Sequence, residues 1–246
     1  MKVAILSDIH ANYEALMAVV EDIEKNNCEK VLCLGDLAMA GPEPKKALDY
    51  IQKQNNWTII QGNTDKLITD FSEDLYNDVL AKFPVMAYAL ADDVKVLDNE
   101  EKEYLKNLPA QMELDIEGVK VLLVHGSPRR NNEDILPNLS IEKVEEIIKD
   151  VNANLIFCGH THIPCGYQTN NKKTVVNVGS VGRPMTDNPQ ACYAIANFES
   201  GAFTIEHRFV DYDREKTSAK MLERGFKGSE TLSQMILNPN SDKRHG

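Results

Sequence analysis

Short apolar runs alternate with amphipathic segments along the chain, a pattern typical of α/β proteins in which helices cover a parallel or mixed sheet. In the first quarter of the chain, the apolar runs predict strands at residues 3–7, 31–34 and 57–61. After the first strand, Asn12 is a candidate N-cap for a helix that continues through Glu24. The apolar residues that recur at helical spacing in this segment are Leu16, Val19, Val20 and Ile23.

The remaining chain continues the alternation. Pro44 suits the first position of a helix that buries Ala47, Leu48 and Ile51. Residues 66–108 carry charged helical patterns, and we expect a helical connection there. A hairpin turn at Glu117-Gly118 separates strands 110–116 and 119–124. Further elements are predicted as helix 141–150 with Ser140 as its cap, strand 154–158, a second sheet completed by strands 165–169, 173–178, 191–198 and 202–210, and helices over 212–236 broken by Gly225 and Gly228.

Length and composition favour one globular domain. The chain has 246 residues and 42% hydrophobic content, enough for a large core over residues 1–237, followed by a polar tail at 238–246 that we expect to be disordered. The amino terminus lacks the pattern of a secretory signal, and no run reaches the ~18 apolar residues of a membrane span. We therefore expect a cytoplasmic protein without membrane contact.

Cysteine usage and charge narrow the class further. Five cysteines at irregular spacing are an odd number, and they are expected to be reduced: Cys28, Cys33, Cys158, Cys165 and Cys192. The net charge is −11, from 38 acidic and 27 basic residues. Because sequence-independent binding of nucleic acid depends on clustered Lys and Arg, a long nucleic-acid partner is disfavoured.

Four of the six histidines fall in short polar blocks that each follow an apolar run. The blocks are Asp8-Ile-His10, Gly35-Asp36, Gly62-Asn63, His125-Gly126 and Gly159-His160-Thr161-His162. A single strand-end His or Asp is usually a cap or a solvated loop residue. Five such blocks in series are far more specific, and we expect the strand ends to converge on one sheet edge and form a metal site.

The donor types indicate which metals such a site binds. Carboxylate, imidazole and amide oxygen together suit Mn²⁺, Fe²⁺, Co²⁺, Ni²⁺ or Zn²⁺, and the chain has no C-x-x-C pair. A two-residue step places Asp8 and His10 on one face if the strand geometry persists, and His160 and His162 repeat it. Asp36 is the natural bridging ligand, because one carboxylate between two cations offsets part of their repulsion.

This order of blocks resembles that of the calcineurin-like metallophosphoesterases, whose pattern is D-x-H, G-D, G-N-H-[DE], a lone H and G-H-x-H. The match runs from Asp8 to His162, and weaker similarity continues through Asn177-Val-Gly-Ser180 to near residue 225. The chain looks closest to the small bacterial and archaeal phosphodiesterases of that superfamily. The resemblance implies an α/β sandwich of two mixed β-sheets flanked by helices, and we expect the connection at 66–108 to lie beside the mouth of the active site.

The resemblance also implies two divalent metal ions, with Mn²⁺ the expected metal and Fe, Ni, Co or Zn the alternatives. By similarity, one metal takes Asp8, His10, Asp36 and His162, and the other takes Asp36, Asn63, His125 and His160. Asp36, Asn63 and His125 are the residues expected to serve catalysis. A hydroxide bridging the metals would attack phosphorus, so neither Ser7 nor Ser127 is needed as a nucleophile.

Thr64 is the main departure from the family pattern, because many relatives carry a histidine there that helps protonate the leaving group. A threonine hydroxyl is far too weak an acid to replace it near pH 7. We therefore expect a preference for leaving groups that depart as weakly basic anions, in phosphoanhydrides and aryl esters. Asp65, without its usual partner, is expected to cap the next helix.

Three residues are candidates for substrate contact. Arg129 and Arg130 follow the His125 block and could bind phosphate bidentately, or they could form a solvated loop pair. Asn12 could contact substrate or only cap its helix. Arg183, in the loop 179–184, is expected to order the histidine loop rather than to touch substrate.

The leading interpretation is a metal-dependent phosphodiesterase or phosphohydrolase for a small phosphorylated substrate, expected to be a nucleotide, with dinucleoside tetraphosphate as one candidate. One alternative is a phosphoprotein or phosphomonoester phosphatase, but serine and threonine phosphates leave as alkoxides and would need the missing acid. A second is a non-catalytic scaffold on the same fold. Such scaffolds tend to lose metal ligands, whereas every ligand position is filled here.

Overall fold

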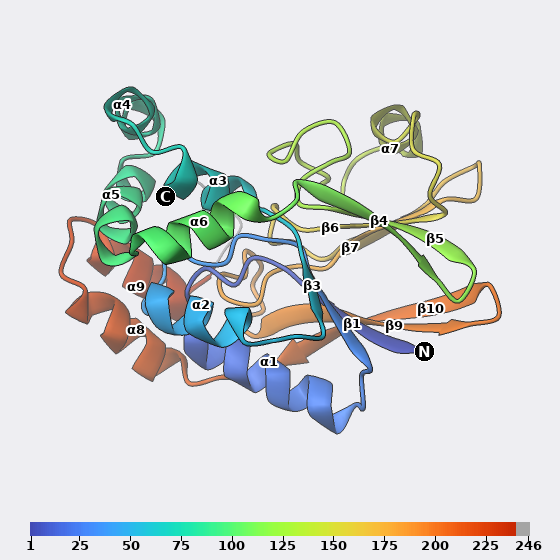
Figure 1. The fold of residues 1–246 in the computed structure, drawn as a ribbon, viewed down its shortest axis with the longest axis horizontal. Coiled ribbons are helices and arrows are strands. Elements are labelled where there is room, and N and C mark those ends of the chain that lie inside the picture. The colour runs from blue at the N-terminus through green and yellow to red at the C-terminus, as the bar shows by residue number, and fades with distance from the viewer. Residues whose placement is uncertain (240–246) are drawn as a thin grey trace.

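Two five-stranded sheets form the centre of the molecule, and helices cover their outer faces (Figure 1). The computed structural model describes residues 1–239, so the tail predicted at 238–246 lies almost entirely outside the described residues. In spatial order, the first sheet consists of β10 (Ala202–Val210), β9 (Ala191–Glu199), β1 (Lys2–Leu6), β2 (Lys30–Cys33) and β3 (Trp57–Ile59). The second consists of β4 (Gln111–Ile116), β5 (Val119–Val124), β6 (Leu155–Cys158), β8 (Thr174–Asn177) and β7 (Cys165–Gln168).

Both sheets are mixed, as the resemblance implied. In the first, β1, β2 and β3 run parallel while β9 and β10 are antiparallel to their neighbours. In the second, β5, β6 and β8 run parallel while β4 and β7 are antiparallel additions at the edges. The predicted sandwich of two mixed sheets flanked by helices is confirmed.

The last two strands belong to a different sheet from the one predicted. We expected residues 191–198 and 202–210 to complete the second sheet, but β9 pairs antiparallel with β1, with Val3 opposite Ala196. The apolar pattern of β9 indicates burial without naming a neighbour, because any extended segment can satisfy the N–H and C=O groups along the free edge of β1. The pairing places β1 inside the first sheet, between β9 and β2.

The core is built from strands that bury both faces. In β1, Val3 and Ile5 point into the space between the two sheets, while Ala4 and Leu6 point toward the helices. This alternation is the two-residue period of a strand. A strand buried on both faces reads as a continuous apolar run, which explains why the runs in β1, β2 and β6 show almost no polar positions.

Helices form the outer layers. The first sheet is covered by α1 (Tyr13–Lys25), α2 (Pro44–Gln52), α8 (Arg214–Glu223) and α9 (Ser229–Leu237), and the second by α7 (Ile141–Ile147). The side chain of Asn12 caps α1 by accepting a hydrogen bond from the backbone N–H of Ala15 at 3.1 Å, as predicted. The helix predicted at 141–150 ends at Ile147, and residues 148–150 form a turn.

The connection between the two sheets is helical, as predicted for residues 66–108. It consists of α3 (Asn63–Thr69), α4 (Glu73–Lys82), α5 (Pro84–Val96) and α6 (Asn99–Asn107), and α4 stands out from the body of the molecule (Figure 1). Buried residues of α5 and α6 join the core beneath the first sheet's helices. Only α4 has no buried residue, so it is the part of the connection least fixed by packing.

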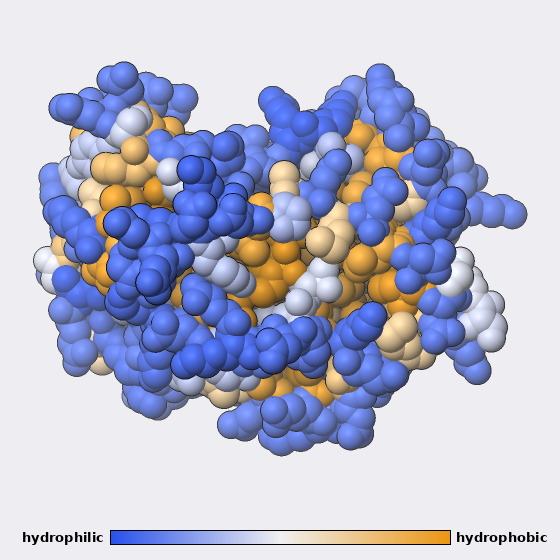
Figure 2. All heavy atoms as spheres, in the orientation of Figure 1, coloured by the Kyte–Doolittle hydropathy of each residue, from blue (hydrophilic) through white to orange (hydrophobic). Residues whose placement is uncertain are grey.

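Charged and polar residues cover most of the face in Figure 2, and apolar residues show only between them. Across residues 1–239, no helix has the length and apolar character that crossing a lipid bilayer would require. All five cysteines are free thiols.

A buried ion pair ties α5 to α8. The Asp93 carboxylate, fully buried on α5, accepts hydrogen bonds from the Arg224 guanidinium at 2.7 Å and from the backbone N–H of Ala40 at 2.9 Å. Arg224 also donates to the backbone carbonyl of Gly41 at 2.6 Å. Burial raises the pKa of Asp93 to about 6, against the opposing effect of Arg224. At neutral pH the carboxylate is ionised, and it depends on Arg224 for its compensating charge.

We predict that Arg224→Met lowers the free energy of unfolding by about 3 kcal/mol at pH 7.5, because it leaves a buried carboxylate without its cation. The penalty belongs to the ionised form. Because loss of Arg224 moves the pKa of Asp93 above its value of about 6, the penalty should shrink as the pH falls toward 6 and Asp93 of the variant takes up a proton. Urea unfolding at pH 7.5 and pH 5 measures both values.

The matched control is Lys25→Met, which removes an exposed pair with Glu21. It should cost less than about 0.5 kcal/mol at either pH. An equal loss at both pH values for Arg224→Met would contradict the role given to the Asp93 charge.

Candidate metal centre

The predicted ligands follow the carboxyl ends of parallel strands from both sheets. They are Asp8 and His10 after β1, Asp36 after β2, Asn63 after β3, His125 after β5, and His160 and His162 after β6. The expectation that they share one sheet edge is corrected, because three of these strands lie in the first sheet and two in the second. The site forms where the carboxyl edges of the two packed sheets meet.

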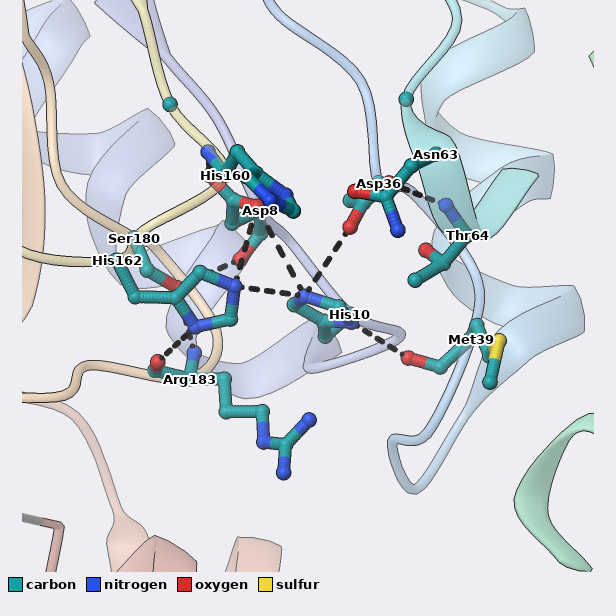
Figure 3. Close-up of polar contacts among 12 residues, drawn as sticks. Asp8, His10, Asp36, Met39, Asn63, Thr64, His160, His162, Ser180 and Arg183 are labelled. Atoms are coloured by element: carbon teal, nitrogen blue, oxygen red, sulfur yellow. Dashed lines mark hydrogen bonds and ion pairs between the residues drawn. The ribbon is translucent and has the colours of Figure 1, made fainter. Parts of the chain in front are cut away.

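Four of the predicted ligands converge tightly. One donor atom from each of Asp8, His10, Asp36 and His162 lies within 4.8 Å of the others, and all four residues are buried (Figure 3). These are the four that the resemblance assigned to a single metal. Their proximity brings together residues 154 positions apart in the chain, from Asp8 to His162.

The histidine rings are fixed by backbone carbonyls. The Nδ1 atoms of His10, His125 and His162 lie 2.6–2.7 Å from the carbonyl oxygens of Met39, Leu34 and Arg183 respectively. A carbonyl can only accept, so each Nδ1 carries a proton, which leaves Nε2 as the nitrogen that can bind a metal. No residue pattern points to these three carbonyls, because every residue has one.

The convergent atoms fit a bound cation. The Nε2 atoms of His10 and His162 lie 3.2 Å apart, and both present lone pairs. Oδ1 of Asp8 is sealed from solvent and makes no hydrogen bond, although Nε2 of His162 is 3.2 Å away. Facing lone pairs and an unsatisfied carboxylate oxygen repel one another unless a positive charge lies between them. Nitrogen and oxygen donors of this kind suit a divalent transition metal.

Asp36 faces two groups of ligands. Its Oδ2 lies 3.6 Å from Nε2 of His10, and its Oδ1 lies 3.4 Å from Nε2 of His125. On the second side, Nε2 of His125 is 2.9 Å from Oδ1 of Asn63, and the His160 ring lies against the His125 ring at 5.3 Å between centroids. Asn63 and His125 thus lie together on the other oxygen of the same carboxylate. With them, His160 completes the second group of candidate ligands, although its Nε2 lies 3.3 Å from the Asp134 carboxylate.

The backbone at the ligands is in the left-handed region. Asp8, His10, Asp36, His160 and His162 all have φ between 45° and 65°. Strand geometry therefore does not persist through the two-residue steps, and the ligand pairs converge through strained turns instead of one strand face. Non-glycine residues rarely adopt this conformation, which costs about 1–3 kcal/mol each and is concentrated at functional sites.

Two glycines allow the ligand turns to approach each other. A Cβ on Gly62 would lie 2.0 Å from Oδ1 of Asp36, and one on Gly159 would lie 2.6 Å from Oδ2 of Asp8. Any side chain at either position would push a ligand carboxylate out of place. The Gly-Asn and Gly-His blocks therefore need their glycines for space.

The Asp65 carboxylate holds two ligand-bearing turns in place by accepting hydrogen bonds from their backbone N–H groups. It caps α3, as predicted, by accepting a hydrogen bond from the backbone N–H of Gly62 at 2.9 Å. It also accepts from the N–H groups of Asp36 and Leu37, each at 2.8 Å, a role that the sequence did not reveal. The side chain is fully buried, so Asp65 fixes the turn that carries the shared ligand.

Charges within the centre set the protonation of its ligands. Burial would raise the pKa of Asp8, but His162 and His125 outweigh it and lower that pKa to about 2. The pKa of Asp36 is lowered further, as His125 and His10 outweigh its burial. Burial lowers the pKa of His10 to about 4, so its ring is neutral near pH 7. Burial would lower the pKa of His125 too, but Asp36 raises it to about 10, and a metal binding there must displace a proton.

A cavity of about 920 Å³ opens beside both ligand groups. His10, Asp36, Asn63, His160 and His162 form part of its lining. Residues of the helical connection also line the cavity. Its apolar contributions include Leu67, Leu75, Val79 and Met86.

The three candidate substrate residues have different positions. Arg130 lines the cavity and is exposed, with its guanidinium 3.5 Å from Glu133. Arg129 is not part of the lining and pairs with Glu133 and Glu146. Asn12 is buried, and both ends of its amide are engaged, one by Ala15 and the other by the carbonyl of Gly182. The structure supports only the capping role for Asn12, and a solvent-facing ion pair for Arg129.

Arg183 contributes to the centre in two ways. Its carbonyl orders His162, in agreement with the expectation that Arg183 orders the histidine loop. Its side chain is also buried and lines the cavity, which the sequence did not predict. Burial lowers its pKa to about 10, so the guanidinium remains charged at neutral pH.

Comparison with known proteins agrees with this geometry. A family model described as the calcineurin-like phosphoesterase superfamily domain matches residues 1–201. An uncharacterized protein of Methanocaldococcus jannaschii is 32% identical over 235 residues, which cover 90% of this chain and 92% of that protein. A metallophosphoesterase from Sphaerobacter thermophilus superposes with a TM-score of 0.79 at 27% identity, over 97% of this chain and 98% of that one. A hypothetical protein from Pyrococcus horikoshii superposes with a TM-score of 0.85 at 24% identity, over 96% and 97% of the two chains, and shows the same fold.

We predict that Asp65→Ala weakens metal binding by about 10- to 100-fold, because partners that orient ligands typically contribute that much to affinity. Its loss leaves three buried N–H groups without acceptors, so the free energy of unfolding should fall by about 3 kcal/mol. Calorimetric titration of chelator-treated protein with Mn²⁺ and urea unfolding give the two values.

Asp65→Asn, which keeps one acceptor oxygen, should fall between Asp65→Ala and the wild type. Asp49→Asn, on the exposed face of α2, serves as the control and should change neither value. Unchanged metal affinity in Asp65→Ala would contradict the supporting role of this carboxylate.

Proposed function

Because the chain belongs to the calcineurin-like phosphoesterase superfamily and is thus a metal-dependent phosphoesterase, we propose that it is a two-metal enzyme hydrolysing small phosphate diesters or nucleotide phosphoanhydrides. The observation that carries the proposal is the position of Asp36, whose two oxygens face separate groups of ligands. Asp8, His10, Asp36 and His162 would hold one ion, and Asp36, Asn63, His125 and His160 the other. When bound, such a pair supplies water activation near neutral pH and offsets charge on phosphate oxygens.

The protein's own side chains orient the ligands and supply no nucleophile. Oγ of Ser7 is sealed from solvent and has no hydrogen-bond partner, so it cannot reach a substrate in the cavity. Oγ of Ser127 bonds to the Glu133 carboxylate and accepts from the backbone N–H groups of Arg129 and Arg130. Both serines are therefore loop-ordering residues. Mn²⁺ is the metal we propose, with Fe, Ni, Co or Zn as alternatives, because the donor set contains no thiolate.

The cavity favours a substrate of nucleotide size. Its volume of about 920 Å³ lies within the 300–1,000 Å³ typical of ligand sites. The ligand groups form part of its lining, and the helical connection contributes apolar side chains (Leu67, Leu75, Val79 and Met86) together with charged ones (Lys66, Asp70, Asp78 and Lys82). A phosphate at the ligand groups would place an attached aryl group or nucleobase against those apolar side chains. The net charge of −11 remains an argument against long nucleic acids.

The surroundings of Thr64 support the proposed preference for leaving groups that depart as stable anions. It lines the cavity next to Asn63, is only 5% exposed, and its hydroxyl has no hydrogen-bond partner. Its backbone N–H donates to Oδ1 of Asp36 at 2.8 Å, so its contribution to the site is structural. A substrate whose leaving group is already a stable anion, such as a nucleotide or a nitrophenolate, needs no acid at this position. Dinucleoside tetraphosphate is one such substrate.

We predict that the protein purified without chelator holds close to two transition-metal ions per chain, and that Asp36→Asn loses metal from both groups because each faces one Asp36 oxygen. Hydrolysis of bis-p-nitrophenyl phosphate should fall by more than about 100-fold, since even residues behind the ligands contribute 10- to 100-fold. Elemental analysis and a steady-state assay measure the two effects.

Asp70→Asn is the control, because Asp70 lines the same cavity but pairs with Lys66 at its rim. It should leave metal content unchanged. An Asp36→Asn protein with two metals and near-normal turnover would refute the two-metal assignment.

We also predict that Thr64→His selectively accelerates substrates with poor leaving groups. General-acid help is typically worth ~10²-fold or more to an alkoxide leaving group, and little to a nitrophenolate. Rates for alkyl and aryl esters of the same nucleotide should therefore differ steeply in the wild type and converge in the variant. Metal content and thermal unfolding must be measured alongside, because residue 64 is buried and a new imidazole could bind metal.

Equal acceleration of both substrates, with two metals retained, would show that position 64 is not where the missing acid belongs. Equal wild-type rates for alkyl and aryl esters would show that another group already supplies the proton.

A further inference from the structure

The guanidinium of Arg183 is buried without an oxygen acceptor. The residue is 9% exposed, its Nε is sealed from solvent with no hydrogen-bond partner, and its two terminal nitrogens face the sulfur atoms of Met86 at 3.2 Å and Met235 at 3.8 Å. A guanidinium has five N–H donors, and a thioether is a weak acceptor. Burying a charge in this way costs free energy unless a counter-charge reaches it.

Among the arginines at positions 1–239, only the Arg183 side chain has neither an ion pair nor a hydrogen bond to a carbonyl. The other five form ion pairs or donate to a backbone carbonyl: Arg129 and Arg130 with Glu133, Arg208 with Asp22, Arg214 with the carbonyl of Leu237, and Arg224 with Asp92 and Asp93. No carboxylate in this part of the chain lies within ion-pair distance of Arg183. Among the described residues, only the more distant carboxylates of Asp36 and Asp8 act on its charge, and neither contacts the guanidinium.

The side chain lies beside the proposed metal centre. Arg183 lines the cavity together with His10 and His162, and its side chain extends past His10, away from Asp8 (Figure 3). Met86 belongs to α5 and Met235 to α9, so two helices enclose the guanidinium. An anion held there would adjoin the position of a phosphate at the ligand groups and would not replace it.

The charges expected at the metal-loaded centre also favour an anionic partner for Arg183. Two divalent ions would bring four positive charges against the two carboxylates Asp8 and Asp36, and Arg183 adds a fifth. The centre would then repel a buried cation beside it. A substrate that carries a second anionic group next to the scissile phosphate resolves this repulsion.

We propose that Arg183 binds the phosphate adjoining the scissile one, and that the enzyme thereby prefers substrates with linked phosphates over diesters with a single phosphate. The proposal rests on the proposed function and names its substrate class. A guanidinium can contact two oxygens of one phosphate at once, which gives this position both affinity and geometric selectivity.

Binding of two stable analogues tests the proposal without hydrolysis. Methylenediphosphonate has a second phosphonate group and methylphosphonate has one, so calorimetric titration of the metal-loaded protein with each isolates the second anion. Arg183→Lys, which keeps the charge but not the planar fork, should weaken methylenediphosphonate binding about tenfold, and Arg183→Met about 100-fold. Methylphosphonate affinity should change by less than about threefold in both variants.

Hydrolysis gives the second measurement. In Arg183→Met, kcat/KM for diadenosine tetraphosphate should fall by about 10- to 100-fold, mainly through KM, while that for bis-p-nitrophenyl phosphate stays within about threefold. Lys66→Met is the control, because Lys66 also lines the cavity but is neutralised by Asp70 at 2.6 Å. It should change neither analogue's affinity.

Equal weakening of both analogues would overturn the proposal and leave Arg183 with its role in positioning His162. Unchanged affinity for methylenediphosphonate in Arg183→Lys would also overturn it, and this test does not require Arg183→Met to fold. Failure of the proposed function would look different, because a protein that hydrolyses neither substrate could still distinguish the two analogues through Arg183.

Discussion

The metal centre brings together buried ligand atoms that repel one another, at the place where the edges of the two sheets meet. The rest of the structure must hold these atoms together. Lone pairs of His10 and His162 face each other at 3.2 Å, beside an Asp8 oxygen that makes no hydrogen bond. A protein interior does not tolerate such a group of acceptors unless a cation joins them. The surrounding architecture holds these atoms in place against that repulsion, which is why the rest of the fold can be understood as support for the centre.

The ligands are held in place mainly by tight backbone turns and by hydrogen bonds to backbone carbonyls, and less by side-chain packing. The ligand turns after β1, β2, β5 and β6 follow strands that are largely buried, whereas β3 is only partly buried, and five ligands accept left-handed backbone conformations. Carbonyls of Met39, Leu34 and Arg183 set the tautomers of three histidines, and Asp65 holds the turn that carries Asp36. Strain of this kind persists only where its neighbours over-determine the geometry. The centre is therefore preorganised by both sheets together.

The helical connection, α3 to α6, forms part of the cavity beside this rigid centre. It provides apolar and charged side chains of the cavity lining and, through Met86, part of the enclosure of Arg183. The connection is anchored by the Asp93–Arg224 pair and by the buried residues of α5 and α6, whereas α4 buries no residue. Metal ligands thus come from the two sheets, while the groups that would select a substrate come from helices and loops around them, where sequence can vary without disturbing the strands.

The sequence by itself determined the strands, the bounds of α1 and α2 to within one or two residues, and the seven candidate ligand positions at the strand ends, because an apolar run followed by Asp, His or Asn is a local signal. The pairing of β9 with β1, the two-sheet origin of the ligands and their left-handed turns were decided only by the tertiary structure. Edge pairing depends on which extended segment is nearby, and backbone conformation depends on glycines such as Gly62 and Gly159 that leave room for a neighbouring turn. Likewise, Arg183 reads as an ordinary loop arginine until the fold removes its water and leaves no acceptor, since burial without a partner is a property of three-dimensional neighbours.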